Sequence, residues 1–146
     1  MKLSPHFTLE ELTVSQAASR LDLDNSPDAF VLAALTHTAK CMEEVRTALG
    51  AKPIYVSSGY RSIAVNKAVG GAVTSQHTKG EAIDFICPAY GTPTAIVARL
   101  RDKIDYDQCI LEYGDSGWVH ISFRRSGNRK QTLVVDSKGT RPYDAK

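Results

Sequence analysis

Hydrophobic residues recur every three or four positions between Ser26 and Gly50, which is typical of a helix that buries one face. The recurring positions are Val31, Leu35, Thr38, Met42, Val45 and Leu49. Ser26 suits an N-cap, Pro27 suits the first helical position, and Gly50 suits the end of the helix. A second amphipathic pattern starts at Thr92-Pro93 and runs to about Ile104. The sequence therefore predicts two core helices.

Short runs of β-branched and aromatic residues predict strands between and after these helices. The runs cover residues 53–57, 81–87, 108–113, 118–123 and 133–135. A hairpin turn is predicted at residues 114–117, between two of these runs. Short helical turns are predicted at residues 8–11 and 62–69. This order predicts an α+β fold with a small, mainly antiparallel sheet and helices packed on one face.

Length and composition indicate one folded domain. The chain has 146 residues, of which 42% are hydrophobic and 23% are charged. We expect a helical part at about 1–50, a core at about 53–123 and a basic C-terminal hairpin at about 124–146. No apolar run approaches the ~20 residues that span a bilayer, and the start of the chain lacks a secretory signal. We therefore expect a monomer that is made in the cytoplasm and has no membrane partner.

Charge and cysteine content argue against a nucleic-acid-binding protein and against a fold held together by disulfides. Residues 124–146 carry seven basic and two acidic side chains, although the whole chain has a net charge of only +2. Such an end favours a solvated hairpin that could touch an anionic wall polymer, and we expect no nucleic-acid partner. Three widely spaced cysteines indicate reduced, mostly buried thiols and no disulfide framework.

Two histidines and one aspartate form the clearest candidate for chemistry. A turn at Gly80 can bring Asp84 back to face His77, and His120 can join them if its strand presents the same face. Two imidazoles and a carboxylate with an open fourth position are what a catalytic zinc ion needs. Two structural histidines and a surface aspartate are the alternative. Asp84 lies on an apolar strand, where a half-buried carboxylate needs a partner.

Five segments together carry a resemblance to a known family. They are Ser57–Ser62, Val65-Asn66, Val69-Gly70-Gly71, Ser75–Asp84 and Trp118-Val119-His120. In these segments the chain resembles the zinc D-Ala-D-Ala carboxypeptidases, a family that includes the L-Ala-D-Glu endopeptidases of phage endolysins and shares its fold with hedgehog domains. Residues 7–12 also resemble the opening of single-domain phage members.

The resemblance implies a role for individual residues. His77, Asp84 and His120 would hold one Zn²⁺ ion per chain, and Arg61 would point at the substrate carbonyl or carboxylate. Ser75 would be a hydroxyl beside the first ligand or on the substrate. Trp118 would pack beneath the site and contact the substrate.

The catalytic base is where the chain departs from the family. Several relatives have Glu or Asp three residues before the last histidine, where this chain has Gly117. Glu112 and Asp115 are the two substitutes. A turn centred on residues 115–116 would place Glu112 opposite His120 on the same face, and we favour Glu112.

The function implied by the resemblance is a zinc metallopeptidase that hydrolyses an amide bond in peptidoglycan stem peptides. Endopeptidase and carboxypeptidase action both remain open. We expect a phage- or prophage-type lytic enzyme that acts on the cell wall after release. The alternative is a hedgehog-like binding or virion structural module that binds zinc without catalysis.

Overall fold

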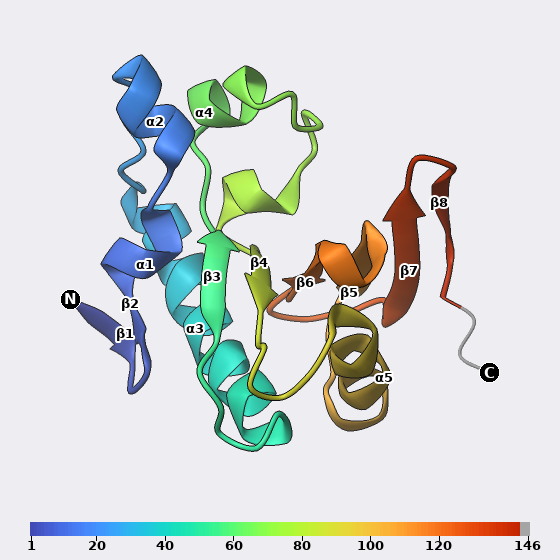
Figure 1. Ribbon diagram of the computed structural model, residues 1–146. Coiled ribbons are helices and arrows are strands. Elements are labelled where there is room, and N and C mark those ends of the chain that lie inside the picture. The colour runs from blue at the N-terminus through green and yellow to red at the C-terminus, as the bar shows by residue number, and fades with distance from the viewer. Residues whose placement is uncertain (144–146) are drawn as a thin grey trace.

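A six-stranded mixed sheet carries most of the chain after residue 54 (Figure 1). The structure is a computed structural model, and it describes residues 1–143. The strands are β3 (Tyr55–Ser58), β4 (Ala82–Ile86), β5 (Gln108–Glu112), β6 (Trp118–Ser122), β7 (Gln131–Asp136) and β8 (Gly139–Pro142). Their order across the sheet is β3-β4-β6-β5-β7-β8. Each strand predicted from the sequence is present, so the α+β prediction is confirmed.

The sheet is mainly antiparallel, as the sequence predicted, and one pair of neighbouring strands is parallel. β7 runs parallel to β5, and every other neighbouring pair is antiparallel. The predicted last edge strand at residues 133–135 lies inside the sheet, because β8 pairs with its outer side. The C-terminal hairpin is therefore part of the sheet. Residues 144–146 of that predicted segment lie outside the described residues.

Two helices cover one face of the sheet, as the sequence predicted. They are α3 (Ala29–Ala48) and α5 (Pro93–Lys103), and both contribute to the main hydrophobic core (Figure 1). The helix α3 begins after the predicted N-cap Ser26, because the Asp28 side chain accepts the hydrogen bond from the Val31 N–H. The predicted apolar stripe of α3 is buried, and only Val31 is partly exposed.

The N-terminal part forms two small strands and two short helices at one side of the sheet. They are β1 (Lys2–Ser4), β2 (Phe7–Thr8), α1 (Leu9–Thr13) and α2 (Gln16–Leu21). Thr8 and Glu11 form a capping box at the start of α1. The strand pair was not predicted, because strands of three and two residues leave almost no alternation to detect.

The described residues also contain the short α4 (Ile63–Ala68) and the 3₁₀ turns η1 (Gln76–Lys79) and η2 (Gly114–Ser116). None of the described helices is long and apolar enough to cross a membrane.

All three cysteines are free, and burial raises the pKa of the Cys109 thiol to about 12. The prediction of mostly buried thiols is confirmed.

The basic end of the chain is largely used to hold the sheet together. Arg124 and Arg129 both pair with the fully buried Asp107, and Arg141 pairs with Asp136 inside the β7–β8 hairpin. Lys130 lies over the Tyr106 ring, with its ammonium nitrogen 4.3 Å from the ring centre. Within residues 124–143, these contacts leave fewer free charges than the composition suggests.

Candidate metal centre

His77 lies on the 3₁₀ turn η1 with one ring nitrogen anchored and the other free. The Ser75 hydroxyl accepts the His77 N–H and begins this turn. Nδ1 lies 2.7 Å from the Gly59 carbonyl oxygen. Since a carbonyl only accepts, Nδ1 carries the hydrogen and Nε2 holds a lone pair in the neutral ring. The residue is 3% exposed, and its Nε2 has no hydrogen-bond partner among the described residues.

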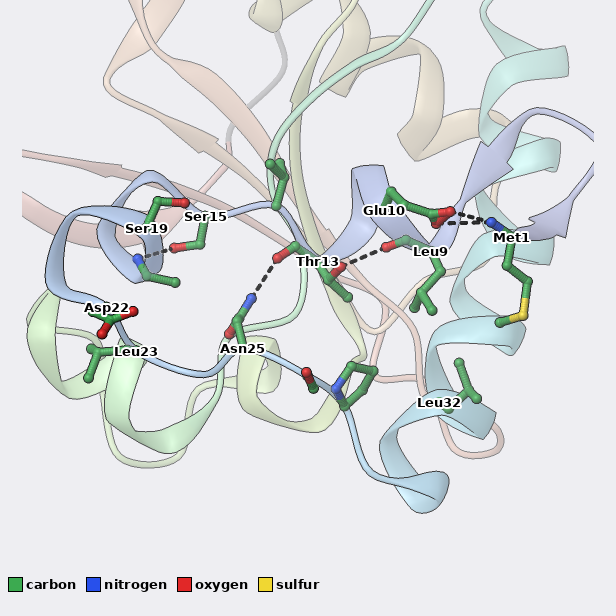
Figure 2. A pocket seen from close by; sticks show the side chains of 14 residues that line it. Met1, Leu9, Glu10, Thr13, Ser15, Ser19, Asp22, Leu23, Asn25 and Leu32 are labelled. Atoms are coloured by element: carbon green, nitrogen blue, oxygen red, sulfur yellow. Dashed lines mark hydrogen bonds and ion pairs between the residues drawn. The ribbon is translucent and has the colours of Figure 1, made fainter.

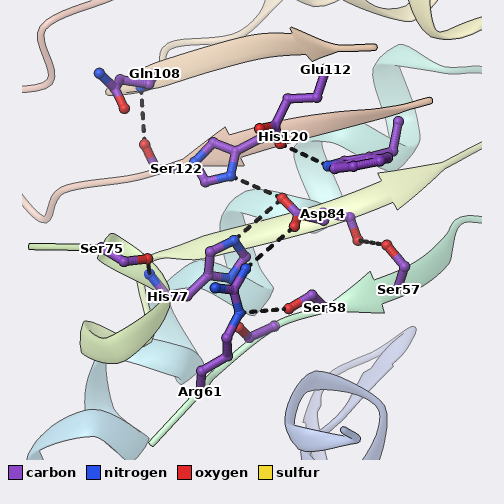
Figure 3. Close-up of polar contacts among 12 residues, drawn as sticks. Ser57, Ser58, Arg61, Ser75, His77, Asp84, Gln108, Glu112, His120 and Ser122 are labelled. Atoms are coloured by element: carbon purple, nitrogen blue, oxygen red, sulfur yellow. Dashed lines mark hydrogen bonds and ion pairs between the residues drawn. The ribbon is translucent and has the colours of Figure 1, made fainter. Parts of the chain in front are cut away.

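Asp84 and His120 are directly opposite each other on β4 and β6. Asp84 Oδ1 lies 2.9 Å from His120 Nδ1 and 3.3 Å from His77 Nε2, so one oxygen faces both rings (Figure 3). Burial alone would raise the pKa of the Asp84 carboxyl. The contacts with His120 and His77 outweigh it and hold that pKa well below its usual range.

These three side chains fit a divalent metal ion. Their ligand atoms all lie within 4.8 Å of one another. The His77 Nε2 lone pair and the Asp84 oxygen are both acceptors at 3.3 Å, so a cation between them would satisfy both. Ligands roughly 2.0–2.2 Å from a tetrahedral zinc ion are separated by about this distance, and two imidazoles with one carboxylate are a zinc donor set. The structure thus brings together the residues that the sequence singled out.

Arg61 approaches the same carboxylate from the other side. Its Nη2 lies 3.8 Å from Asp84 Oδ2, the oxygen that faces away from the histidines (Figure 3). Its Nε donates to the Ser58 hydroxyl at 3.2 Å, and its Nη1 donates to the Asn66 side-chain oxygen at 3.0 Å. The guanidinium is therefore fixed beside the metal-binding group.

Glu112 lies on the same face of the sheet as His120, but the predicted pairing was wrong by two residues. Glu112 is opposite Trp118, and Ile110 is opposite His120. The turn is closed by Tyr113 and Gly114, which both have positive φ, and this shifts its centre to residue 115. Because alternate residues of a strand share a face, Glu112, Trp118 and His120 still point the same way.

The indole of Trp118 contacts Glu112 directly. Its Nε1 donates to Glu112 Oε2 at 2.7 Å, and its ring packs against Tyr113 with ring centres 5.6 Å apart. Burial and the negative charge of Asp84 raise the pKa of the Glu112 carboxyl, although the Trp118 hydrogen bond opposes the shift. Trp118 therefore orients the candidate base, and a contact with substrate stays a prediction.

The Asp115 carboxylate forms its hydrogen bonds with Thr94, outside the candidate metal centre. Its Oδ1 accepts hydrogen bonds from the Thr94 N–H at 3.0 Å and the Thr94 hydroxyl at 2.5 Å, at the start of α5. These bonds hold the pKa of the Asp115 carboxyl below its usual value. At Gly117, a Cβ would lie 1.8 Å from the Glu112 carbonyl oxygen, so this turn has no room for a Glu or Asp there. This placement favours Glu112 over Asp115 as the base.

Three groups at the site were not assigned a role from the sequence. They are the Gly59 carbonyl, which fixes His77, and the Ser58 and Asn66 side chains, which fix Arg61. Ser58, Gly59 and Asn66 all lie within the segments that carry the family resemblance. Their contacts depend on tertiary geometry, which spacing alone does not give.

A hollow in the N-terminal part of the fold is separate from this site. It measures about 730 Å³ and lies between α1, α2 and the start of α3 (Figure 2). Asn25 crosses it to the Thr13 carbonyl, and Glu10 pairs with the N-terminal amine of Met1. Its lining includes none of the three clustered ligands.

Comparison with known proteins identifies the family of the chain. A stretch of 44 residues is 46% identical to the zinc D-Ala-D-Ala carboxypeptidase of Streptomyces albus G. This stretch is 30% of the chain but only 17% of that protein, so the likeness is to a small part of the relative. Residues 5–122 match the peptidase M15 family, which covers both the N-terminal part and the clustered ligands. The chain therefore belongs to the peptidase M15 family.

Proposed function

We propose that this protein is a zinc-dependent peptidase that hydrolyses an amide bond in the stem peptides of bacterial peptidoglycan. The convergence of His77, Asp84 and His120 is the observation that carries the proposal, because a buried nitrogen of the His77 ring has no hydrogen-bond partner in the part of the chain that the structure describes. Membership of the peptidase M15 family and the likeness to a zinc D-Ala-D-Ala carboxypeptidase support the choice of metal and substrate.

Glu112 is the proposed general base. A bound zinc ion supplies a Lewis acid and a water molecule of lowered pKa. The Trp118 N–H holds Glu112 Oε2, so Oε1 is the oxygen that can accept a proton from the attacking water. The same carboxyl then gives the proton to the leaving amine. The raised pKa of Glu112 suits both steps, because it brings the carboxyl nearer to the pH at which it must give and take a proton.

Arg61 is the proposed electrostatic partner of the substrate. Its side chain is partly exposed, and it also lines a hollow of about 240 Å³ together with Ser57 and Ser58. A guanidinium in this place can bind a substrate carboxylate or stabilise the oxyanion that forms on the scissile carbonyl. Stem peptides offer both groups, so endopeptidase and carboxypeptidase action are both compatible with this role.

The finer proposal is a lytic enzyme of the phage or prophage type that acts on the cell wall after release. The likeness of residues 7–12 to the opening of single-domain phage members supports it. These residues form β2 and the start of α1, in the N-terminal part of the fold. Clearing of a suspension of outer-membrane-stripped cells would support this role, and cleavage of soluble muropeptides without clearing would contradict it.

Digestion of purified peptidoglycan tests the proposed activity. Zinc-loaded protein, chelator-treated protein and protein reloaded with zinc are incubated with peptidoglycan, and the released fragments are analysed by mass spectrometry. We expect one type of amide bond to be cut by the loaded and reloaded samples only. Stoichiometric zinc without any cleavage would contradict the proposal and favour the alternative, a zinc-binding module without catalysis.

A further inference from the structure

Asn66 connects the Arg61 guanidinium to the loop that leads to His77. Its side-chain oxygen accepts from Arg61 Nη1 at 3.0 Å, and its side-chain nitrogen donates to the Ala72 carbonyl at 2.8 Å. The residue is 4% exposed, although it lies on the short helix α4 at the surface. Both ends of the buried amide are thus satisfied, and one of them is satisfied by the candidate substrate-binding cation.

Gly71 leaves the space in which this amide lies. A Cβ at Gly71 would be 2.0 Å from the Asn66 side-chain oxygen and 2.9 Å from Arg61 Nη1. Gly71 has no positive φ, so the requirement for glycine here is one of space and not of backbone conformation. The Gly71 N–H also donates to the Asn66 carbonyl at 2.9 Å, which holds the loop against the amide.

Two neutral acceptors set the direction of the guanidinium. Ser58 takes the Nε hydrogen and Asn66 takes one Nη1 hydrogen, so the remaining three N–H donors have no hydrogen-bond partner among the described residues. Nη2 points towards Asp84, but at 3.8 Å it forms an ion pair without a hydrogen bond. The plane of the guanidinium is fixed by these two bonds, and Nη2 faces the carboxylate of the candidate metal centre.

We propose that Asn66 is a positioning residue that acts through Arg61, with Gly71 keeping the amide in place. This inference rests on the proposed function, because Arg61 has a catalytic part only if the chain is a peptidase. A neutral amide suits the role, since it fixes the guanidinium without neutralising the charge that the substrate must meet. A displacement of about 1 Å at such a group can cost about 100-fold in rate.

A double-mutant cycle on kcat/KM tests this role. Four proteins are compared after their zinc contents are shown to be equal: wild type, Asn66→Ala, Arg61→Ala and the double variant. We expect Asn66→Ala to lower kcat by about 10- to 100-fold with KM changed less. In the Arg61→Ala background the same substitution should cost less than about threefold, because the group it positions is already gone. Equal losses in both backgrounds would overturn the proposal.

Gly71→Ala provides a second variant that keeps the Asn66 side chain. We expect it to displace the Asn66 amide and to lower kcat in the same way as Asn66→Ala. In the Arg61→Ala background it should change kcat as little as Asn66→Ala does. Lys67→Ala, one residue along α4 and exposed, is the matched control and should match wild type. Gly71→Ala with wild-type kcat would contradict the proposal.

A readout without turnover separates positioning from a general loss of structure. The Arg61 Nη1–H signal, which comes from the group that donates to Asn66, is followed by ¹⁵N NMR in the zinc-loaded proteins, together with urea unfolding. We expect a slowly exchanging signal in wild type that exchanges faster in Asn66→Ala. An unchanged signal would overturn the inference. An inactive wild type that binds zinc would overturn the proposed function instead, so the two failures are distinguishable.

Discussion

Asp84 and His120 are cross-strand partners in the antiparallel pair β4–β6, and Asp84 Oδ1 lies 2.9 Å from His120 Nδ1. The register of two strands in the centre of the sheet therefore fixes two of the three candidate ligands. The third ligand, His77, comes from the turn just before β4. A metal centre built in this way depends on the sheet and not on a flexible loop.

Loss of a ligand side chain should abolish stoichiometric zinc binding. We expect His77→Ala and Asp84→Ala to retain less than about a tenth of the zinc after dialysis, because two ligands rarely hold the ion. Inductively coupled plasma mass spectrometry measures the content. His37→Ala, which changes a histidine outside the cluster, should keep one zinc ion per chain. Full occupancy in the Asp84→Ala protein would be incompatible with the assigned ligands.

Glu112→Gln should separate metal binding from catalysis. The substitution removes the carboxylate that takes the proton but keeps an acceptor for the Trp118 N–H, so zinc should remain bound. We expect kcat to fall by about 10²–10⁴-fold. Asp115→Asn should stay near wild type, because Asp115 caps the start of α5 through Thr94. The assignment is reversed if only the Asp115→Asn protein is inactive while loaded with zinc.

The pH dependence of kcat/KM should report the raised pKa of Glu112. A general base must be ionised, so activity falls as the pH drops through this pKa. Burial and the negative charge of Asp84 both raise it above the ordinary value of 4.5. Trp118→Phe removes a donor that favours the ionised form, so the acidic limb should move to higher pH. An acidic limb that moves to lower pH, or does not move, would contradict the role of Trp118.

Asp107 should be a main source of stability for the C-terminal strands. It is fully buried and accepts from the Arg129 side chain at 2.9 and 2.6 Å. Asp107→Asn should lower the free energy of unfolding by about 1.5–3 kcal/mol, the worth of hydrogen bonds to a charged group. Urea unfolding measures this free energy. Asp136→Asn, in the exposed pair with Arg141, is the control and should have a small effect.

The stabilisation by Asp107 should also depend on pH. Burial raises the pKa of its carboxyl, but the contacts with Arg129 and Arg124 outweigh burial and lower it below the ordinary value of 3.8. The unfolded chain therefore takes up the proton first as the pH falls. The contribution is complete above 3.8 and is lost below it, as the pH passes through the lower pKa of the folded state. A stability difference from Asp107→Asn that does not shrink as the pH is lowered below 3.8 would contradict this origin.

Local patterns were enough to predict the elements that position the site. The stripe of α3, the Thr92-Pro93 start of α5 and the strands around Asp84 and His120 all follow from periodicity and end signals. These signals succeed because each element buries one face in a single core. The same patterns allowed the ligands to converge without requiring it, and the ligand set itself came from the resemblance to the zinc carboxypeptidases. The structure adds the register that places Asp84 opposite His120.

Features that depend on tertiary contacts were missed or wrong. Next to the parallel β5–β7 pair, the buried Asp107 precedes β5 and binds Arg124 and Arg129 of the β6–β7 connection, a contact between distant residues that spacing does not predict. The predicted pairing of Glu112 was wrong by two residues because the backbone at Tyr113 is left-handed. This conformation is uncommon for a residue other than glycine, so it is not predicted from the sequence. The contact between Arg61 and Asn66 spans five residues and forms only when the loop folds back.

Anomalous X-ray diffraction at the zinc edge tests the central claim most directly. Crystals of the zinc-loaded protein should show one strong peak, bound by one nitrogen each of His77 and His120 and by an oxygen of Asp84, with no sulfur ligand. Data collected below the edge should lose the peak, which identifies the metal. A peak at a cysteine or at the surface, with the His77 Nε2 still unliganded, would contradict the account.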